Sequence, residues 1–89
     1  MIFPEDSGNI PTGELAWTSR TIPSGDYDGI TWDGSLFVAV GSNLCSTSPD
    51  GITWTSRTIS SGNYISITWN GSLFVAVGIA SVCITSPAN

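Results

Sequence analysis

Residues 48–59 read SPDGITWTSRTI, and the second half of this stretch, WTSRTI, also occurs at residues 17–22. The tryptophans that open the two copies, Trp17 and Trp54, are 37 residues apart. A chain of 89 residues that repeats itself at this period is typical of folds in which one small structural unit stacks on the next. The structure of the repeated unit therefore decides the fold.

The repeat covers most of the chain. When residues 17–41 are aligned with residues 54–78, 20 of the 25 positions are identical. Beyond this region the offset becomes 38, which aligns Cys45 with Cys83. Such identity within one chain indicates a recent duplication or deliberate engineering, and it predicts that equivalent residues take equivalent places in the two units.

Each unit is predicted to form short antiparallel strands, because β-branched and aromatic residues occur in runs bounded by turn residues. The hairpin signals are Asp-Gly at residues 33–34 and Asn-Gly at residues 70–71, which favour a type I′ turn. No stretch has a helical period. The predicted strands are residues 30–33, 36–40, 44–48 and 52–59 in the first unit, and residues 67–70, 73–77 and 82–86 in the second.

The run LFVAV at residues 36–40 and 73–77 is apolar without alternation. This pattern fits an antiparallel strand that is covered on both faces, so each sheet needs a neighbouring sheet. Small four-stranded antiparallel sheets that repeat about every 40 residues and stack on one another are the blades of a β-propeller. The predicted fold class is therefore all-β, with propeller blades of four antiparallel strands and two blades per chain.

The stretch SPDGITW resembles the Asp-box turn of sialidase-type and related propellers, whose pattern is Ser/Thr-x-Asp-x-Gly-x-Thr-Trp. The matching residues include Ser48, Asp50, Gly51 and Trp54, with one residue fewer between the aspartate and the glycine. Ser48 and Asp50 can hydrogen-bond backbone groups in the turn, and Gly51 can adopt a positive φ. Trp54 can pack between blades. We expect these four residues to have a structural role.

The repeat also predicts the domain boundaries. Residues 1–14 form an N-terminal arm, residues 23–59 form blade 1, and residues 60–89 form blade 2 without its outermost strand. Residues 15–22 are equivalent to an outermost strand, but no sheet of their own comes before them. Where SPDG would lead into a fourth strand, blade 2 has SPAN, with Ala88 and Asn89 in place of the aspartate and glycine.

The spare strand at residues 15–22 predicts an assembly of several copies. Two blades cannot enclose an axis, so the spare strand is expected to complete a blade of a neighbouring chain. Closing all strand edges requires a cyclic homo-oligomer with head-to-tail contacts. Six blades, and hence a trimer, is the favoured size, while a dimer with four blades or a tetramer with eight are the alternatives.

Enzyme chemistry is not expected. The sialidase resemblance would imply an arginine cluster and a tyrosine nucleophile, but the chain has only Arg20 and Arg57, at equivalent repeat positions far from any shared centre. Without histidine there is no Ser–His or Cys–His nucleophile pair. We predict no catalytic residue and no cofactor.

Charge and hydropathy exclude other classes. The net charge is −5, with no lysine, so the chain cannot present the basic face that nucleic acid requires. We expect neither a signal peptide nor a membrane-spanning segment, and the sequence assigns no compartment. Charged residues make up only 10% of the chain, which suggests that much of its surface meets other protein.

A carbohydrate ligand is one hypothesis for function. The wider loops carry Tyr27 beside Asp26 and Tyr64 beside Asn63, and Asn43 lies in a loop on the same face of the ring. An aromatic plane next to hydrogen-bonding groups suits a sugar. One alternative is that the tyrosines pack between blades. The other is a structural part, such as a phage-type appendage or an engineered propeller, that binds no ligand.

Two pairs of side chains, one of aspartates and one of cysteines, suggest a metal site and a disulfide. Asp26 and Asp28 could ligate calcium, but the equivalent loop of blade 2 has lost both charges, and calcium needs six or more oxygens. We predict no metal. Cys45 and Cys83 occupy matching places in adjacent blades, so two free thiols are favoured over a disulfide.

Overall fold

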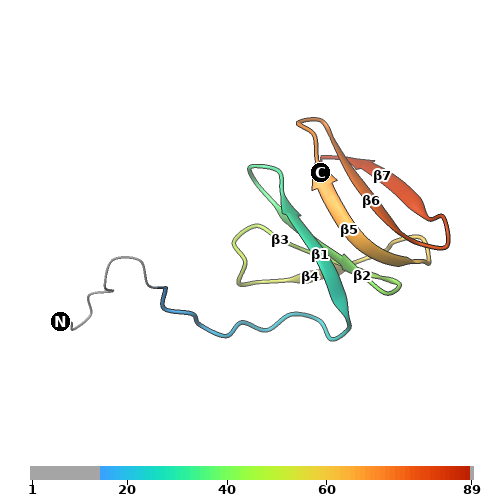
Figure 1. Ribbon diagram of the computed structural model, residues 1–89. Coiled ribbons are helices and arrows are strands. Elements are labelled where there is room, and N and C mark those ends of the chain that lie inside the picture. The colour runs from blue at the N-terminus through green and yellow to red at the C-terminus, as the bar shows by residue number, and fades with distance from the viewer. Residues whose placement is uncertain (1–14, 89) are drawn as a thin grey trace.

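The computed structural model describes residues 15–88 and folds them into two antiparallel sheets (Figure 1). In each sheet the strands follow one another in chain order, as in a meander. The first sheet contains β1 (Tyr27–Trp32), β2 (Phe37–Gly41), β3 (Leu44–Ser48) and β4 (Thr55–Arg57). The second sheet contains β5 (Asn63–Trp69), β6 (Leu73–Ile79) and β7 (Cys83–Pro87). The predictions of an all-β chain with four strands and then three are confirmed.

The tight hairpins that join β1 to β2 and β5 to β6 have the same construction. The carboxylate Oδ1 of Asp33 accepts hydrogen bonds from the backbone N–H groups of Ser35 and Leu36, each at 2.8 Å. Asn70 accepts the two equivalent bonds at the same length. The predicted type I′ turn is wrong, because only the glycine has a positive φ, 101° at Gly34. One positive φ at the first central residue is the pattern of a type II′ turn.

A β-bulge bends the first strand of each sheet. The pairing of β1 with β2 shifts register between Tyr27 and Gly29, and the pairing of β5 with β6 shifts at the equivalent place. Near this bulge the backbone comes so close that a Cβ atom on Gly41 would lie 1.7 Å from the carbonyl oxygen of Asp26. Only glycine fits there, and Gly78 repeats the arrangement in the second sheet.

The core lies between the two sheets. Its buried members are Val38, Val40 and Cys45 from the first sheet and Tyr64, Phe74 and Ala76 from the second. Strand β1 packs against β5, and β2 also reaches β5. Gly29 allows this approach, because a Cβ atom there would be only 3.1 Å from the Cα atom of Ser66.

The predicted strand at residues 15–22 is not formed in the single chain. This segment has no strand structure, and in Figure 1 it leads away from both sheets. Leu15 is 72% exposed and Trp17 is 87% exposed. An extended segment gains ladder hydrogen bonds only when it lies beside another strand, and it lies beside none of the described strands. Its pairing with a second chain stays a prediction, and the predicted arm at residues 1–14 lies outside the described residues.

Candidate assembly interface

The two sheets pack through opposite faces of equivalent strands. The first sheet presents Val38, Val40 and Cys45, which are 6%, 0% and 9% exposed, to the second sheet. The second sheet presents its other face, whose side chains alternate along the strands with the equivalents of Val38, Val40 and Cys45. Phe74 and Ala76 belong to this face. We call the first kind of face the valine face and the second kind the aromatic face. One valine face therefore packs on one aromatic face within the chain.

Each sheet also has a second face, which takes no part in the contact between the two sheets of the chain. Strand alternation places Val77, the equivalent of Val40, on the free valine face of the second sheet, where it is 43% exposed. Cys83, the equivalent of Cys45, is exposed beside it. The free aromatic face of the first sheet carries Ile30 and Trp32, which are 57% and 45% exposed. The chain therefore displays both halves of the contact that it makes inside itself.

Hydrogen bonds between loops fix the position of one sheet on the other. The backbone N–H of Asn43 donates to the carbonyl of Gly62, and the N–H of Gly62 donates to the Asn43 Oδ1, each at 2.8 Å. The hydroxyl of Ser42 donates to the Asn63 Oδ1 at 2.9 Å. Asn43 and Asn63, both predicted to contact a ligand, are therefore used to join the sheets.

Residues 48–53 form a turn that is held by a network of short hydrogen bonds. The hydroxyl oxygen of Ser48 accepts from the N–H of Gly51 at 2.8 Å, and the hydroxyl donates to the Asp50 carboxylate at 3.1 Å. The same carboxylate oxygen accepts from the N–H groups of Ile52 and Thr53. These bonds, that of Thr53 first and that of Ile52 next, hold the pKa of Asp50 below its ordinary value.

Gly51 acts as predicted, while the packing of Trp54 between blades stays a prediction. Gly51 has a φ of 78°, which favours glycine. Trp54 donates its indole N–H to the carbonyl of Gly51 at 3.1 Å. The ring of Trp54 lies 6.3 Å from Phe37, whose ring lies 4.6 Å from Trp32. This row of three rings covers the outer part of the aromatic face.

The two tyrosines predicted to contact a ligand have their hydroxyls bound to the protein itself. The Tyr27 hydroxyl donates to the carbonyl of Pro23 at 2.8 Å and lies 2.8 Å from the Ser46 hydroxyl. Because its single proton is given to Pro23, Ser46 is the donor to the tyrosine oxygen. Tyr64 is only 1% exposed, and its hydroxyl donates to the carbonyl of Ser60. This geometry favours packing between the sheets for Tyr64, whereas Tyr27 is bonded to Pro23 and to Ser46 of its own sheet.

The remaining charged and thiol groups are dispersed. Asp26 is exposed, and its backbone carbonyl accepts a hydrogen bond from the N–H of Ser42. Among residues 15–88, no group of three or more Asp, Glu, Cys or His side chains is placed to hold a metal ion. Both thiols are free, and burial raises the pKa of Cys45 while the nearby Arg57 partly offsets the effect. No helix in the described part of the chain is long and apolar enough to cross a membrane.

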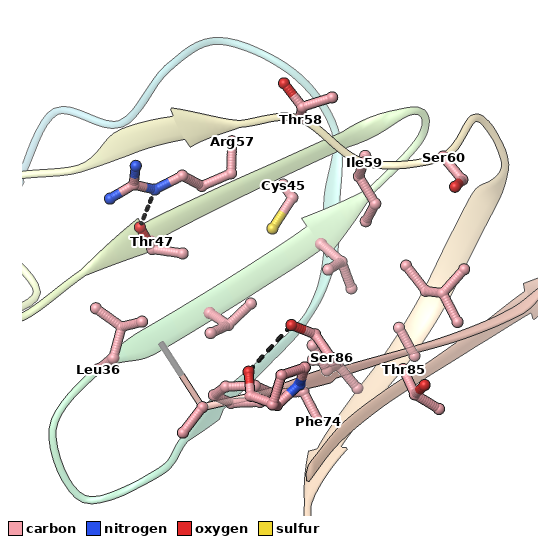
Figure 2. Close-up of a pocket in the computed structure, with 17 residues that line it drawn as sticks. Leu36, Cys45, Thr47, Arg57, Thr58, Ile59, Ser60, Phe74, Thr85 and Ser86 are labelled. Atoms are coloured by element: carbon pink, nitrogen blue, oxygen red, sulfur yellow. Dashed lines mark hydrogen bonds between the residues drawn. The ribbon is translucent and has the colours of Figure 1, made fainter.

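An open cavity of about 600 Å³ lies between the outer parts of the two sheets (Figure 2). Leu36 and Val38 line it from the first sheet, and Phe74 lines it from the second. Arg57 stands at its edge, where its Nε donates to the Thr47 hydroxyl at 2.9 Å. Sequence reasoning did not predict this cavity, because it arises where β4 has no counterpart in the second sheet.

Comparisons with protein-family models, with curated proteins and with solved structures found no match.

The two tyrosines offer a matched test of their packing role. Tyr27→Phe should lower the free energy of unfolding by about 1–3 kcal/mol, because it leaves the fully buried Ser46 hydroxyl without its acceptor. Tyr64→Phe should cost only about 1 kcal/mol, because the second sheet has Ile84 at the position of Ser46 and loses one hydrogen bond. Chemical denaturation measures both values. Equal losses would contradict the assignment.

The Asp50 network should make stability fall in acid. Because folding lowers the pKa of Asp50, its contribution is complete above about pH 4, the ordinary value, and is lost as the pH falls through the lower folded value. Asp50→Asn should therefore flatten the loss of unfolding free energy in acid. Asp33→Asn is the control, because Asn70 already makes the same two turn bonds. Identical acid profiles of wild type and Asp50→Asn would contradict this role.

Proposed function

We propose that the chain is a non-enzymatic β-propeller module that assembles head to tail with copies of itself into a closed ring. The proposal rests on one observation. The chain packs one valine face on one aromatic face and leaves a second face of each kind uncovered. Val40 is fully buried where the second sheet covers it, and the equivalent Val77 is 43% exposed. A free valine face on the second sheet is complementary to the free aromatic face of the first sheet.

The two free faces belong to different sheets, so the contact between copies is heterologous. Heterologous contacts form a ring where the rotation closes and an open fibre where it does not. Six blades, supplied by three copies, is the favoured closure. Two or four copies are the alternatives, and the mass of the assembly decides among them.

Low charge supports the assembly role. The free faces carry large apolar side chains, including Ile30, Trp32 and Val77, that a single chain leaves in water. Burying them would contribute roughly 25 cal/mol for each Å² of apolar surface. Because the chain has no lysine, burying these faces does not require the desolvation of a lysine side chain.

The carbohydrate hypothesis stays a prediction beside this proposal. A ring that served only as a structural part would bind no glycan, whereas a lectin would bind through several equivalent sites with a gain in avidity. A glycan array probed with the assembled protein separates the two. Reproducible binding to one sugar class would favour the lectin.

The free valine face can be tested by charge. Val77→Asp should leave the single chain folded, because Val77 is already 43% exposed, and should abolish assembly by placing a carboxylate in an apolar contact. Ser72→Asp, in an exposed turn, adds the same charge away from both faces. Light scattering should give wild type and Ser72→Asp a mass of three times the 9.3 kDa of one chain. Val77→Asp should have the mass of a single chain. A monomeric wild type would refute the proposal.

The two thiols report the same contact without mutation. In the single chain, alkylation should be fast at the exposed Cys83 and slow at the buried Cys45. In the ring, Cys83 would be covered as Cys45 is, so its alkylation rate should fall at least tenfold above the assembly concentration. Mass spectrometry of modified peptides measures both sites, with Cys45 as the internal reference. A Cys83 rate that does not depend on protein concentration would count against assembly through this face.

A further inference from the structure

The second sheet lacks the third ring of the aromatic row. Trp69 and Phe74 lie 4.6 Å apart at 48°, which reproduces the pair of Trp32 and Phe37 in the first sheet. In the first sheet Trp54 follows next to Phe37, but the second sheet has no equivalent of Trp54 among residues 15–88. Phe74 instead borders the open cavity between the sheets.

Trp17 is the residue whose sequence context fits this place. Residues 17–22 are identical to the stretch that begins at Trp54 and forms β4, and Trp17 is 87% exposed in the single chain. The outer edge of β7 has no strand beside it. Ala88 occupies the position equivalent to Asp50, which in the first sheet begins the turn to the fourth strand. Ala88 has no side-chain oxygen to accept the turn hydrogen bonds that Asp50 accepts.

We propose that residues 15–22 of a second copy add to the β7 edge as a fourth strand and place Trp17 in the cavity against Phe74. This inference rests on the proposed ring. The register follows from the first sheet, in which Arg57 pairs with Cys45, Ser56 with Ser46 and Thr55 with Thr47. The equivalent pairs between copies are Arg20 with Cys83, Ser19 with Ile84, and Thr18 with Thr85.

The side chains of these pairs are compatible. Arg57 donates to the Thr47 hydroxyl at 2.9 Å, and Thr85 gives Arg20 the same acceptor. Thr85 borders the cavity on the β7 side, and Leu36 faces it from the first sheet (Figure 2). Trp17 would therefore be enclosed by both sheets of the receiving copy. A large aromatic anchor in an apolar pocket is the usual centre of a stable contact between proteins.

The topology requires the segment to come from another copy. Strand β4 precedes β5 in the chain but belongs to the first sheet, which contacts β5 through its valine face. Residues 15–22 precede β1 in the same way. The sheet to which they would belong therefore contacts the first sheet on the free aromatic face of the first sheet. The second sheet of the same chain lies on the other side of the first sheet. The neighbour that covers Val77 therefore also supplies the strand.

A disulfide between copies tests the register directly. Arg20→Cys in a Cys45→Ala background leaves one natural thiol, Cys83, as the partner. With oxidised glutathione as electron acceptor, the introduced thiol should join Cys83 of another copy and give covalent oligomers on a non-reducing gel. Ser19→Cys is the matched control, because its side chain would point to the opposite face and should not react with Cys83.

A disulfide within the chain calibrates the method. Arg57→Cys in a Cys83→Ala background should join Cys45 inside one chain, because those two positions pair in the first sheet. If this link forms and the assembly has the ring mass, but Arg20→Cys does not link copies, the strand addition is refuted while the ring stands. A monomeric protein refutes both. A link to Cys83 inside a single chain would also overturn the inference, because the segment would then close its own chain.

Trp17→Ala provides a second measurement. Because Trp17 is exposed in the single chain, the variant should keep the unfolding free energy of the monomer. The assembly should dissociate at a concentration at least about thirtyfold higher, as expected for the loss of an anchoring tryptophan. Trp54→Ala is the contrasting variant, since Trp54 packs on Phe37 within the chain and its loss should destabilise the monomer itself. An unchanged dissociation of Trp17→Ala would remove Trp17 from the contact.

Discussion

The packing of the valine face of one sheet on the aromatic face of the next is the contact on which the rest of the structure depends. The buried side chains of the valine face depend on this contact, because the second sheet lies over Val38 and Val40. In a chain of repeated units, a residue that is covered in one unit is necessarily uncovered in the last unit of an open stack. The exposure of Val77 agrees with this rule, because Val77 ends the same LFVAV run as its buried equivalent Val40.

Small differences between the units would make the two kinds of contact distinct. Gly29 allows β1 to approach β5 closely, whereas the equivalent position on the second sheet is Ser66. The aromatic face of the first sheet carries the polar Ser46, and that of the second sheet carries Ile84. A ring of copies would then place the exposed Ser66 in the contact between chains, where the contact inside each chain has Gly29. Such a difference favours one order of sheets, because the wrong pairing leaves a hydroxyl or an apolar side chain poorly matched.

The sequence predicts most of the fold because both the strands and the turns depend on local chemistry. Runs of β-branched residues place six of the seven strands within a few residues, and Ser48, Asp50 and Gly51 build their turn from groups close in the chain. Longer-range features were missed. The predicted strand at 52–59 shrinks to Thr55–Arg57 because the turn network takes its first residues. The tyrosine hydroxyls could not be placed, because the partner of Tyr27 at Ser46 is 19 residues away.

Assembly and folding are linked in such a chain. A single copy leaves two apolar faces and the edge of β7 uncovered, so further surface would be buried in the proposed contact between copies. Whatever binds the folded state and not the unfolded state raises stability in proportion to the logarithm of its concentration. In the proposed assembly the ligand would be another copy, so the unfolding midpoint would rise with protein concentration. The repeat that leaves Val77 uncovered in a single chain would thereby also provide, in a second copy, the face that covers it.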